Sequence, residues 1–187
     1  MIAHRFQNYI VKIFNDPTFS VKSTDRNHSY RRCYFSKDAY EYPTSKHGIK
    51  VFQNDIEINS CLIIGHGGAT GINKNSTLVD DENLLICCCD SIFSLRIETL
   101  ELRWLVQADT ATCFQIFKLE DDYVIHGETE ITRIDSNGNI KWNFGGADIF
   151  VNINGETEFI LHEDHIQLID FGNRRYKINF NGNELCC

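Results

Sequence analysis

The sequence predicts an all-β fold, built as a small propeller-like array of repeated units. Three stretches resemble one another, and they close on the similar segments 103–106, 141–144 and 177–180. These segments are 38 and 36 residues apart, and a repeat of this length made of short strands is typical of blades or stacked sheets. Aromatic residues make up 12% of the chain, which suits half-buried pleated surfaces.

The first clear unit opens with a continuous apolar run at residues 84–89. A second strand is expected at 91–97, and the turn at Glu98 and Thr99 leads into a closing strand at 100–106. Continuous apolar runs of this length, separated by turn residues, indicate β-strands.

The second unit gives the clearest copy of the repeat. An alternating strand at 111–119 is followed by an acidic turn at 120–122 and by strands at 123–127 and 130–134. The segment 135–138 reads Asp-Ser-Asn-Gly, and Asn and Gly tolerate the positive φ that a tight hairpin turn requires. A strand at 140–144 closes the unit.

The third unit is expected to repeat this pattern with strands at 149–153, 159–162, 166–171 and 176–180. The segment 45–52 resembles 136–144, and 32–35 supplies a preceding strand, so the N-terminal region is predicted to be a degenerate fourth unit. Residues 6–14 combine helical spacing with aromatic and β-branched content, and we favour a strand there. We therefore expect one all-β domain over 1–187, with an irregular unit at 1–60 and repeat units at 61–187. The alternative is a two-sheet β-sandwich.

The string from Asp135 to Phe144 resembles the end of a PQQ-like β-propeller blade, which finishes on an aspartate, a turn with glycine and a strand that carries tryptophan. The resemblance covers residues 69–180 and implies the propeller fold. Trp104 matches in the first copy, although its turn lacks glycine, and Ile178 takes the tryptophan position in the third copy. Nothing matches the quinone or calcium ligands of the complete enzymes, so no cofactor is implied.

The whole chain also resembles small uncharacterised bacterial β-repeat proteins through the segments 47–49, 67–71 and 125–128. This resemblance implies a function as an immunity or antitoxin partner. The formal net charge of −8 argues against nucleic-acid binding, because proteins of that class usually present a basic face. The local basic residues Lys22, Arg26, Arg31 and Arg32 are interpreted as a solvated face.

The chain shows no secretory leader pattern and no apolar stretch of about 18 residues, so we expect no membrane association. The eight cysteines are then expected to be thiols in the cytoplasm. The leading prediction is a non-catalytic protein-interaction module whose acidic face binds a protein partner, such as a basic toxin domain. An open array would leave sheet edges that also favour a homodimer.

The leading prediction includes no cofactor, but the repeat suggests an alternative with zinc. Aligning the units places Cys87, His126 and His162 at equivalent positions, each at the end of an apolar strand, and His66 lies in a glycine-rich turn. Thiolate and imidazole groups from symmetric blades could converge on Zn²⁺. Small buried thiols and residues that merely end a strand are the simpler interpretation.

Four residues at the starts of units are the candidate ligand-binding residues: Gly67, Gly68, Asp109 and Asp148. Glycines let a backbone approach a ligand closely, and acids that line a channel bind cations, although both also serve in turns. The alternative to an interaction module is an enzyme or small-ligand binder that uses His66, His126 and Glu128. His126 and Glu128 share one face of a strand, so a hydrogen bond between them could activate a water molecule.

Overall fold

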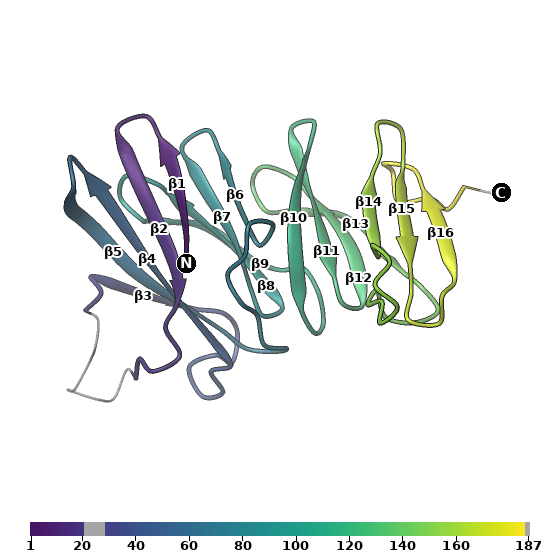
Figure 1. Ribbon diagram of the computed structural model, residues 1–187, viewed down its shortest axis with the longest axis horizontal. Coiled ribbons are helices and arrows are strands. Elements are labelled where there is room, and N and C mark those ends of the chain that lie inside the picture. The colour runs from purple at the N-terminus through teal and green to yellow at the C-terminus, as the bar shows by residue number, and fades with distance from the viewer. Residues whose placement is uncertain (21–28, 186–187) are drawn as a thin grey trace.

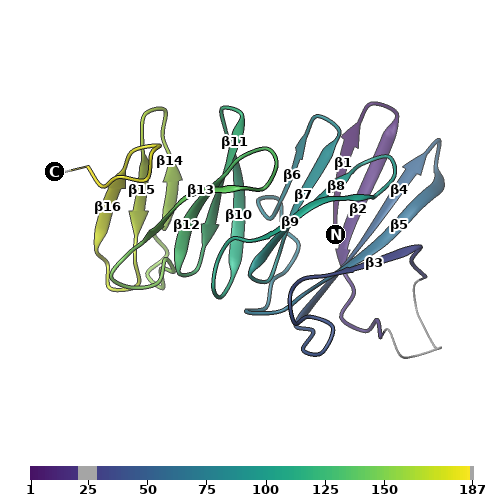
Figure 2. The ribbon, with the colours of Figure 1, turned by 180° about the vertical axis from the view of Figure 1, so that it is seen from behind.

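The computed structural model describes residues 1–20 and 29–185, and these residues form sixteen strands in four sheets that stand in a row (Figure 1). The sheet formed by β1–β5 and the sheet formed by β14–β16 lie at opposite ends of the row, and the view from behind agrees (Figure 2). The predicted all-β, propeller-like array is therefore confirmed, and the two-sheet sandwich is not formed. Within the described residues, no helix is long and apolar enough to cross a membrane.

Sheet A is the degenerate N-terminal unit. Its strands run in the order β1-β2-β4-β5-β3, and β3 pairs parallel to β5 whereas the other neighbours are antiparallel. The strand expected at 6–14 is formed from residue 9 onward, because Val11 and Ile13 are buried against the next sheet; residue 6 instead ends β1, and a turn at 7–8 separates the two strands. The strands are β1 (Ile2–Phe6), β2 (Tyr9–Asn15), β3 (Arg32–Phe35), β4 (Ser45–Gln53) and β5 (Ile56–Gly65).

Sheets B and C are the two regular units, and each is a four-stranded antiparallel meander. Their equivalent features lie 38 residues apart, as the repeat predicts. Sheet B contains β6 (Thr77–Asp80), β7 (Asn83–Cys88), β8 (Ser91–Arg96) and β9 (Leu102–Gln107). Sheet C contains β10 (Cys113–Leu119), β11 (Asp122–Gly127), β12 (Glu130–Ile134) and β13 (Ile140–Gly145).

Sheet D has three strands instead of the four expected: β14 (Phe159–Leu161), β15 (Ile166–Ile169) and β16 (Arg175–Ile178). The strand expected at 149–153 is not formed. Phe150 is fully buried, but Ile153 is 73% exposed, and Asn152 Oδ1 accepts the backbone N–H of Asn154 in a local turn. A side-chain turn of this kind competes with strand pairing.

The spacing of the third unit also differs from the prediction. Asn179 Oδ1 accepts the backbone N–H groups of Asn181 and Asn183, just as Asp135 Oδ1 accepts those of Asn137 and Asn139. The turn after β16 is thus equivalent to the turn after β12, which lies 44 residues earlier. The segment 177–180 is not a closing strand but the end of a third strand and the start of its turn. Its resemblance to 141–144 is misleading.

Three apolar layers hold the row together, one between each pair of neighbouring sheets. Val11, Ile49 and Ile63 of sheet A pack with Leu84 and Ile86 of sheet B. The layer between sheets B and C is formed by side chains such as Leu85, Cys87, Ile116 and Ile125, and the layer between sheets C and D by Val124, Ile131, Phe150, Ile166 and Leu168. Each inner sheet is therefore apolar on both faces, which explains the continuous apolar runs in its strands.

A repeated contact joins the last strand of sheet B to the final turn of sheet C, and the last strand of sheet C to the final turn of sheet D. The indole Nε1–H of Trp104 donates to Ser136 O at 3.0 Å, and that of Trp142 donates to Phe180 O at 2.9 Å. Each indole ring lies on a glycine of that turn, so that a Cβ at Gly138 or Gly182 would come within 2.7 Å of the ring. We call this contact the Trp–Gly latch. The glycine that each tryptophan requires belongs to the next unit.

Candidate functional site

The segments that begin the units gather along one rim, at the bottom of Figure 1, which we call the linker rim. It contains residues 66–76, 108–112 and 146–158, together with the turns at 89–90 and 128–129. Backbone hydrogen bonds connect successive units here: Gly68 N–H donates to Ala111 O at 2.9 Å, and Phe150 N–H donates to Glu128 O at 2.7 Å. The candidate residues Gly67, Gly68, Asp109 and Asp148 all belong to this rim.

Asp109 is the most heavily bonded acid of the rim. It is only 2% exposed, and its two carboxylate oxygens accept the backbone N–H groups of Ala111, Thr112, Thr129 and Glu130 at 2.6–3.0 Å, as well as the Thr129 hydroxyl. The carboxylate therefore clamps the start of β10 to the turn between β11 and β12. Because these hydrogen bonds occupy both carboxylate oxygens, the contacts of Asp109 indicate a structural role.

Gly67 and Gly68 are glycines because the chain passes very close to the start of β10. Gly67 has a φ of 116°, and a Cβ there would come within 2.7 Å of Ala111 O. A Cβ on Gly68 would overlap the hydroxyl of Thr112. The close approach is made to the protein's own backbone. Asp148 is exposed, and its Oδ1 accepts the backbone N–H of Ile149 at 2.9 Å.

The structure does not bring the four candidate zinc ligands together. Cys87 is buried between sheets B and C, whereas the ring of His126 stacks on Phe159 of sheet D. His162 lies in the β14–β15 turn, stacked on His165, and His66 bonds to Tyr42 O. Among the described residues, no three His, Cys, Asp or Glu side chains are grouped so that they could hold a metal ion.

The physical reason is the direction in which equivalent side chains point. Register places Cys87 opposite Ile92 and His126 opposite Ile131, so these two positions are truly equivalent. In a row of stacked sheets, equivalent side chains point toward the next sheet and enter different layers. His162 is not equivalent to either of them, because the 36-residue alignment that related it to them does not hold.

His126 and Glu128 also have separate partners. The His126 ring nitrogens lie 3.1 Å from Phe150 O and 3.4 Å from Gln115 Oε1, and the Glu128 carboxylate accepts the hydroxyl of Thr112 at 2.7 Å. Burial lowers the pKa of His126, which keeps the ring neutral at pH 7. The buried thiols follow the same principle, since burial raises the pKa values of Cys61, Cys87 and Cys113.

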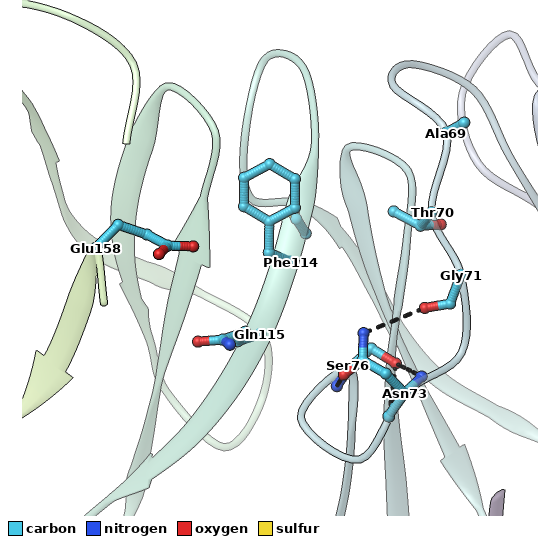
Figure 3. Close-up of a pocket in the computed structure, with 9 residues that line it drawn as sticks. Ala69, Thr70, Gly71, Asn73, Ser76, Phe114, Gln115 and Glu158 are labelled. Atoms are coloured by element: carbon cyan, nitrogen blue, oxygen red, sulfur yellow. Dashed lines mark hydrogen bonds between the residues drawn. The ribbon is translucent and has the colours of Figure 1, made fainter. Parts of the chain in front are cut away.

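A cavity of about 240 Å³ lies where the linker before β6, the start of β10 and the residue before β14 meet (Figure 3). We call it the linker-rim cavity. Phe114 lies between Glu158 and the linker residues in this view, and Glu158 extends toward Phe114 and Gln115 from the side of sheet D (Figure 3). The lining residues are Ala69, Thr70, Gly71, Asn73, Ser76, Cys113, Phe114, Gln115 and Glu158.

The polar groups of this cavity differ in how far they are used by the fold. Thr70 Oγ1 accepts the backbone N–H of Cys89, and Asn73 Oδ1 accepts the backbone N–H groups of Asn75 and Ser76. Within the described part of the chain, the Glu158 carboxylate makes no hydrogen bond or ion pair. It is half-buried and is the only charged side chain among the residues that line the cavity.

No protein-family model matches the sequence, and no curated protein matches it. Among solved structures, the chain is similar to the computationally designed Ika8 protein, with a TM-score of 0.55, 9% identity, and coverage of 95% of this chain and 45% of that chain. It is also similar, at a TM-score of 0.47 and 12% identity, to the AfRom2 CNH domain, over 75% of this chain and 46% of that one.

A third similar structure is BamB from Moraxella catarrhalis, a β-propeller protein, with a TM-score of 0.42, 10% identity, and coverage of 74% of this chain and 57% of that chain. The chain thus spans about half the length of these structures. At such low identity, the likeness to Ika8 concerns the fold alone.

Sequence reasoning singled out Gly67 and Gly68, which precede the lining residue Ala69, but it missed Phe114, Gln115 and Glu158, which line the cavity. Phe114 and Gln115 lie in a strand for which the sequence predicted only an alternation of apolar and polar residues. Glu158 was given no role. No local signal marks the three residues, because two sheets and a linker must pack before they meet.

Proposed function

We propose that this protein is a non-catalytic binding module that holds a basic protein partner against an acidic rim. The observation that carries the proposal is the composition of four hairpin turns, at residues 7–8, 81–82, 120–121 and 162–165. They lie along the same rim, at the top of Figure 1, which we call the hairpin rim. The last three turns each present two exposed acids: Asp81, Glu82, Glu120, Asp121, Glu163 and Asp164.

Half of these acids are available for a partner. Glu82 pairs with Arg96 and Arg103, Glu120 pairs with Arg133, and Asp164 pairs with His165. Asp81, Asp121 and Glu163 make no ion pair with the described residues. Because stacked sheets repeat about every 10 Å, the three turns form a row of negative charge that complements a basic surface and accelerates its association.

The finer part of the proposal is that the partner is a toxin domain and that binding masks it, as in immunity or antitoxin proteins. The net charge of −8 and the resemblance of segments 47–49, 67–71 and 125–128 to small bacterial β-repeat proteins support this part. We place the protein in the cytoplasm under the same proposal. A homodimer is the alternative partner arrangement.

The contacts of the candidate catalytic residues favour binding over catalysis. His126 and Glu128 bond to different groups, and the carboxylate of Asp109 is occupied by backbone N–H groups, so these three residues do not form an acid–base pair. The linker-rim cavity could still bind a small ligand, because its Glu158 carboxylate makes no hydrogen bond or ion pair with the described residues.

The test is capture of partners from native lysate, followed by affinity measurements with the purified partner. We expect the captured partner to be a basic protein. Its association constant should fall as the salt concentration rises, because salt screens the attraction between the charges. The double variant Asp121→Asn/Glu163→Gln should weaken binding about tenfold, or about 1.4 kcal/mol, and reduce the salt dependence.

The control is Asp38→Asn/Glu41→Gln, which removes the same charge from the exposed turn that follows β3 and should bind like the wild type. The proposal fails if the protein elutes alone at its monomer mass with no enriched partner. It also fails if the rim variant binds as tightly as the control.

A further inference from the structure

We propose that the linker-rim cavity binds the guanidinium group of an arginine side chain in a peptide chain. The source of that arginine, a protein partner, rests on the proposed function, whereas the chemistry of the cavity stands on its own residues. The hairpin rim and the cavity lie on opposite rims of the row, so they are separate contacts.

Charge is the first argument. Glu158 supplies one uncompensated negative charge, and no cationic residue lines the cavity. The imidazole of His126 packs on Phe114 and does not line the cavity, and its lowered pKa keeps it neutral, so it does not repel a cation. A half-buried carboxylate without a partner is stabilised most by a positively charged hydrogen-bond donor.

The aromatic ring is the second argument. Phe114 is partly exposed and stands between Glu158 and the linker residues 70–76 (Figure 3). Its ring packs edge-on against His126 at a centroid distance of 5.5 Å, which holds its orientation. A planar, weakly hydrated guanidinium can stack on such a ring while it donates to a carboxylate, whereas an ammonium group is a strongly hydrated point charge.

The remaining polar groups are acceptors at suitable positions. Gln115 contributes an amide whose oxygen lies 3.4 Å from His126 Nδ1, and the carbonyl of Gly71 receives only a long bond of 3.4 Å from Asn73 Nδ2. A guanidinium has five N–H donors, so it can bond to Glu158 and still reach a second acceptor. This combination of carboxylate, ring and neutral acceptors therefore favours arginine over lysine.

The experiment is a titration of the ¹⁵N-labelled protein followed by NMR, with blocked amino acids as probes. N-acetyl-arginine amide should shift the amide signals of Gly71, Asn73 and Gln115 with a Kd on the order of 1 mM. N-acetyl-citrulline amide has nearly the same shape without the charge and should bind at least tenfold more weakly. N-acetyl-lysine amide should bind several-fold more weakly than the arginine probe.

Three variants complete the design, and the spectrum itself reports whether each one is folded. Glu158→Gln should weaken the arginine probe at least tenfold, and Phe114→Leu, which keeps apolar bulk, should weaken it several-fold. Glu41→Gln removes an equal charge from the exposed turn that follows β3 and should leave binding unchanged.

The inference is overturned if citrulline or lysine binds as well as arginine, if Glu158→Gln binds like the wild type, or if the three signals do not respond. Free arginine that binds tenfold more tightly than the blocked form would overturn the peptide source. A negative result with the probe, together with partner binding that depends on Asp121 and Glu163, removes this inference and leaves the proposed function standing.

Discussion

His47 is a buried titratable residue whose environment opposes its charged form. Its side chain is fully buried in β4, Nε2 lies 3.2 Å from Thr70 Oγ1, and Nδ1 has no partner within the described structure. Burial lowers the pKa of His47 to about 4. The neutral ring therefore belongs to the folded state, and protonation favours the unfolded state, where the pKa is about 6.5.

The sign of the pH dependence follows from this difference. Between pH 6.5 and about 4 the unfolded chain binds the proton and the folded protein does not, so stability is complete above pH 6.5 and is lost as the pH falls. We predict that the free energy of unfolding falls between pH 7 and pH 5, with His47 contributing up to about 1.4 kcal/mol per pH unit below 6.5.

Urea unfolding at a series of pH values measures this slope. His47→Gln should make the slope shallower, although His4 and His126, whose pKa values burial also lowers, keep part of it. The control variant His162→Gln changes an exposed residue of the β14–β15 turn and should retain the wild-type slope. An unchanged slope in His47→Gln would contradict the prediction.

The Trp–Gly latch is a contact between neighbouring sheets that occurs twice in the molecule. In sheet A, which has no tryptophan, Tyr34 of β3 occupies the place of the indole, and its hydroxyl donates to Leu100 O at 2.9 Å. Leu100 has a φ of 53°, in the region that Gly138 and Gly182 occupy in the later turns. The parallel strand β3 therefore completes the degenerate unit, since it brings Tyr34 to the final turn of sheet B.

Gly138→Ala tests the latch. The new Cβ would meet the Trp104 ring at 2.7 Å, and the backbone would keep an unfavourable positive φ of 84°. The matched control is Gly155→Ala, because Gly155 has a φ of 81° and no atom lies within 4 Å of the added Cβ. Both variants carry a backbone cost of about 1–2 kcal/mol, and overpacking should add about 1–3 kcal/mol at Gly138 alone.

Urea unfolding and tryptophan fluorescence measure these two effects. Gly138→Ala should change the emission of Trp104, and Gly155→Ala should not. If the two variants lose equal stability, the ring contact contributes little and the latch does not hold neighbouring sheets together.

The whole molecule is a row in which each sheet packs only on its neighbours. Sheets B and C have an apolar layer on both faces, whereas sheet D has one on a single face and exposes Gln167 and Lys177 in part on the other. In arrays of this kind, stability is approximately a sum of unit terms and nearest-neighbour terms, so the ends open first.

We therefore predict a gradient of amide hydrogen exchange along the row. The amides of β7 and β8, at the centre of sheet B, should exchange most slowly, and those of β14–β16 most rapidly among the strands. Hydrogen exchange followed by mass spectrometry or NMR measures this gradient. Equal protection in sheets B and D would show that the molecule opens as one cooperative unit.

The sequence by itself determined the strand content, the regular units B and C and their 38-residue spacing. These features depend on local patterns, since apolar runs, alternation and turn residues act over a few positions. It also singled out Gly67, Gly68 and Asp109 at the starts of units, but as candidate ligand-binding residues; only the structure showed their contacts within the fold.

Only the tertiary structure decided the third unit, the latch and the cavity. Segments 141–144 and 177–180 look alike, yet their pairing is set by the turns around them and by the sheet on which they pack. Each tryptophan meets a glycine of the following unit, and Glu158 and Phe114 line one cavity only after sheets C and D have packed together. Contacts between units depend on long-range packing, which no local pattern encodes.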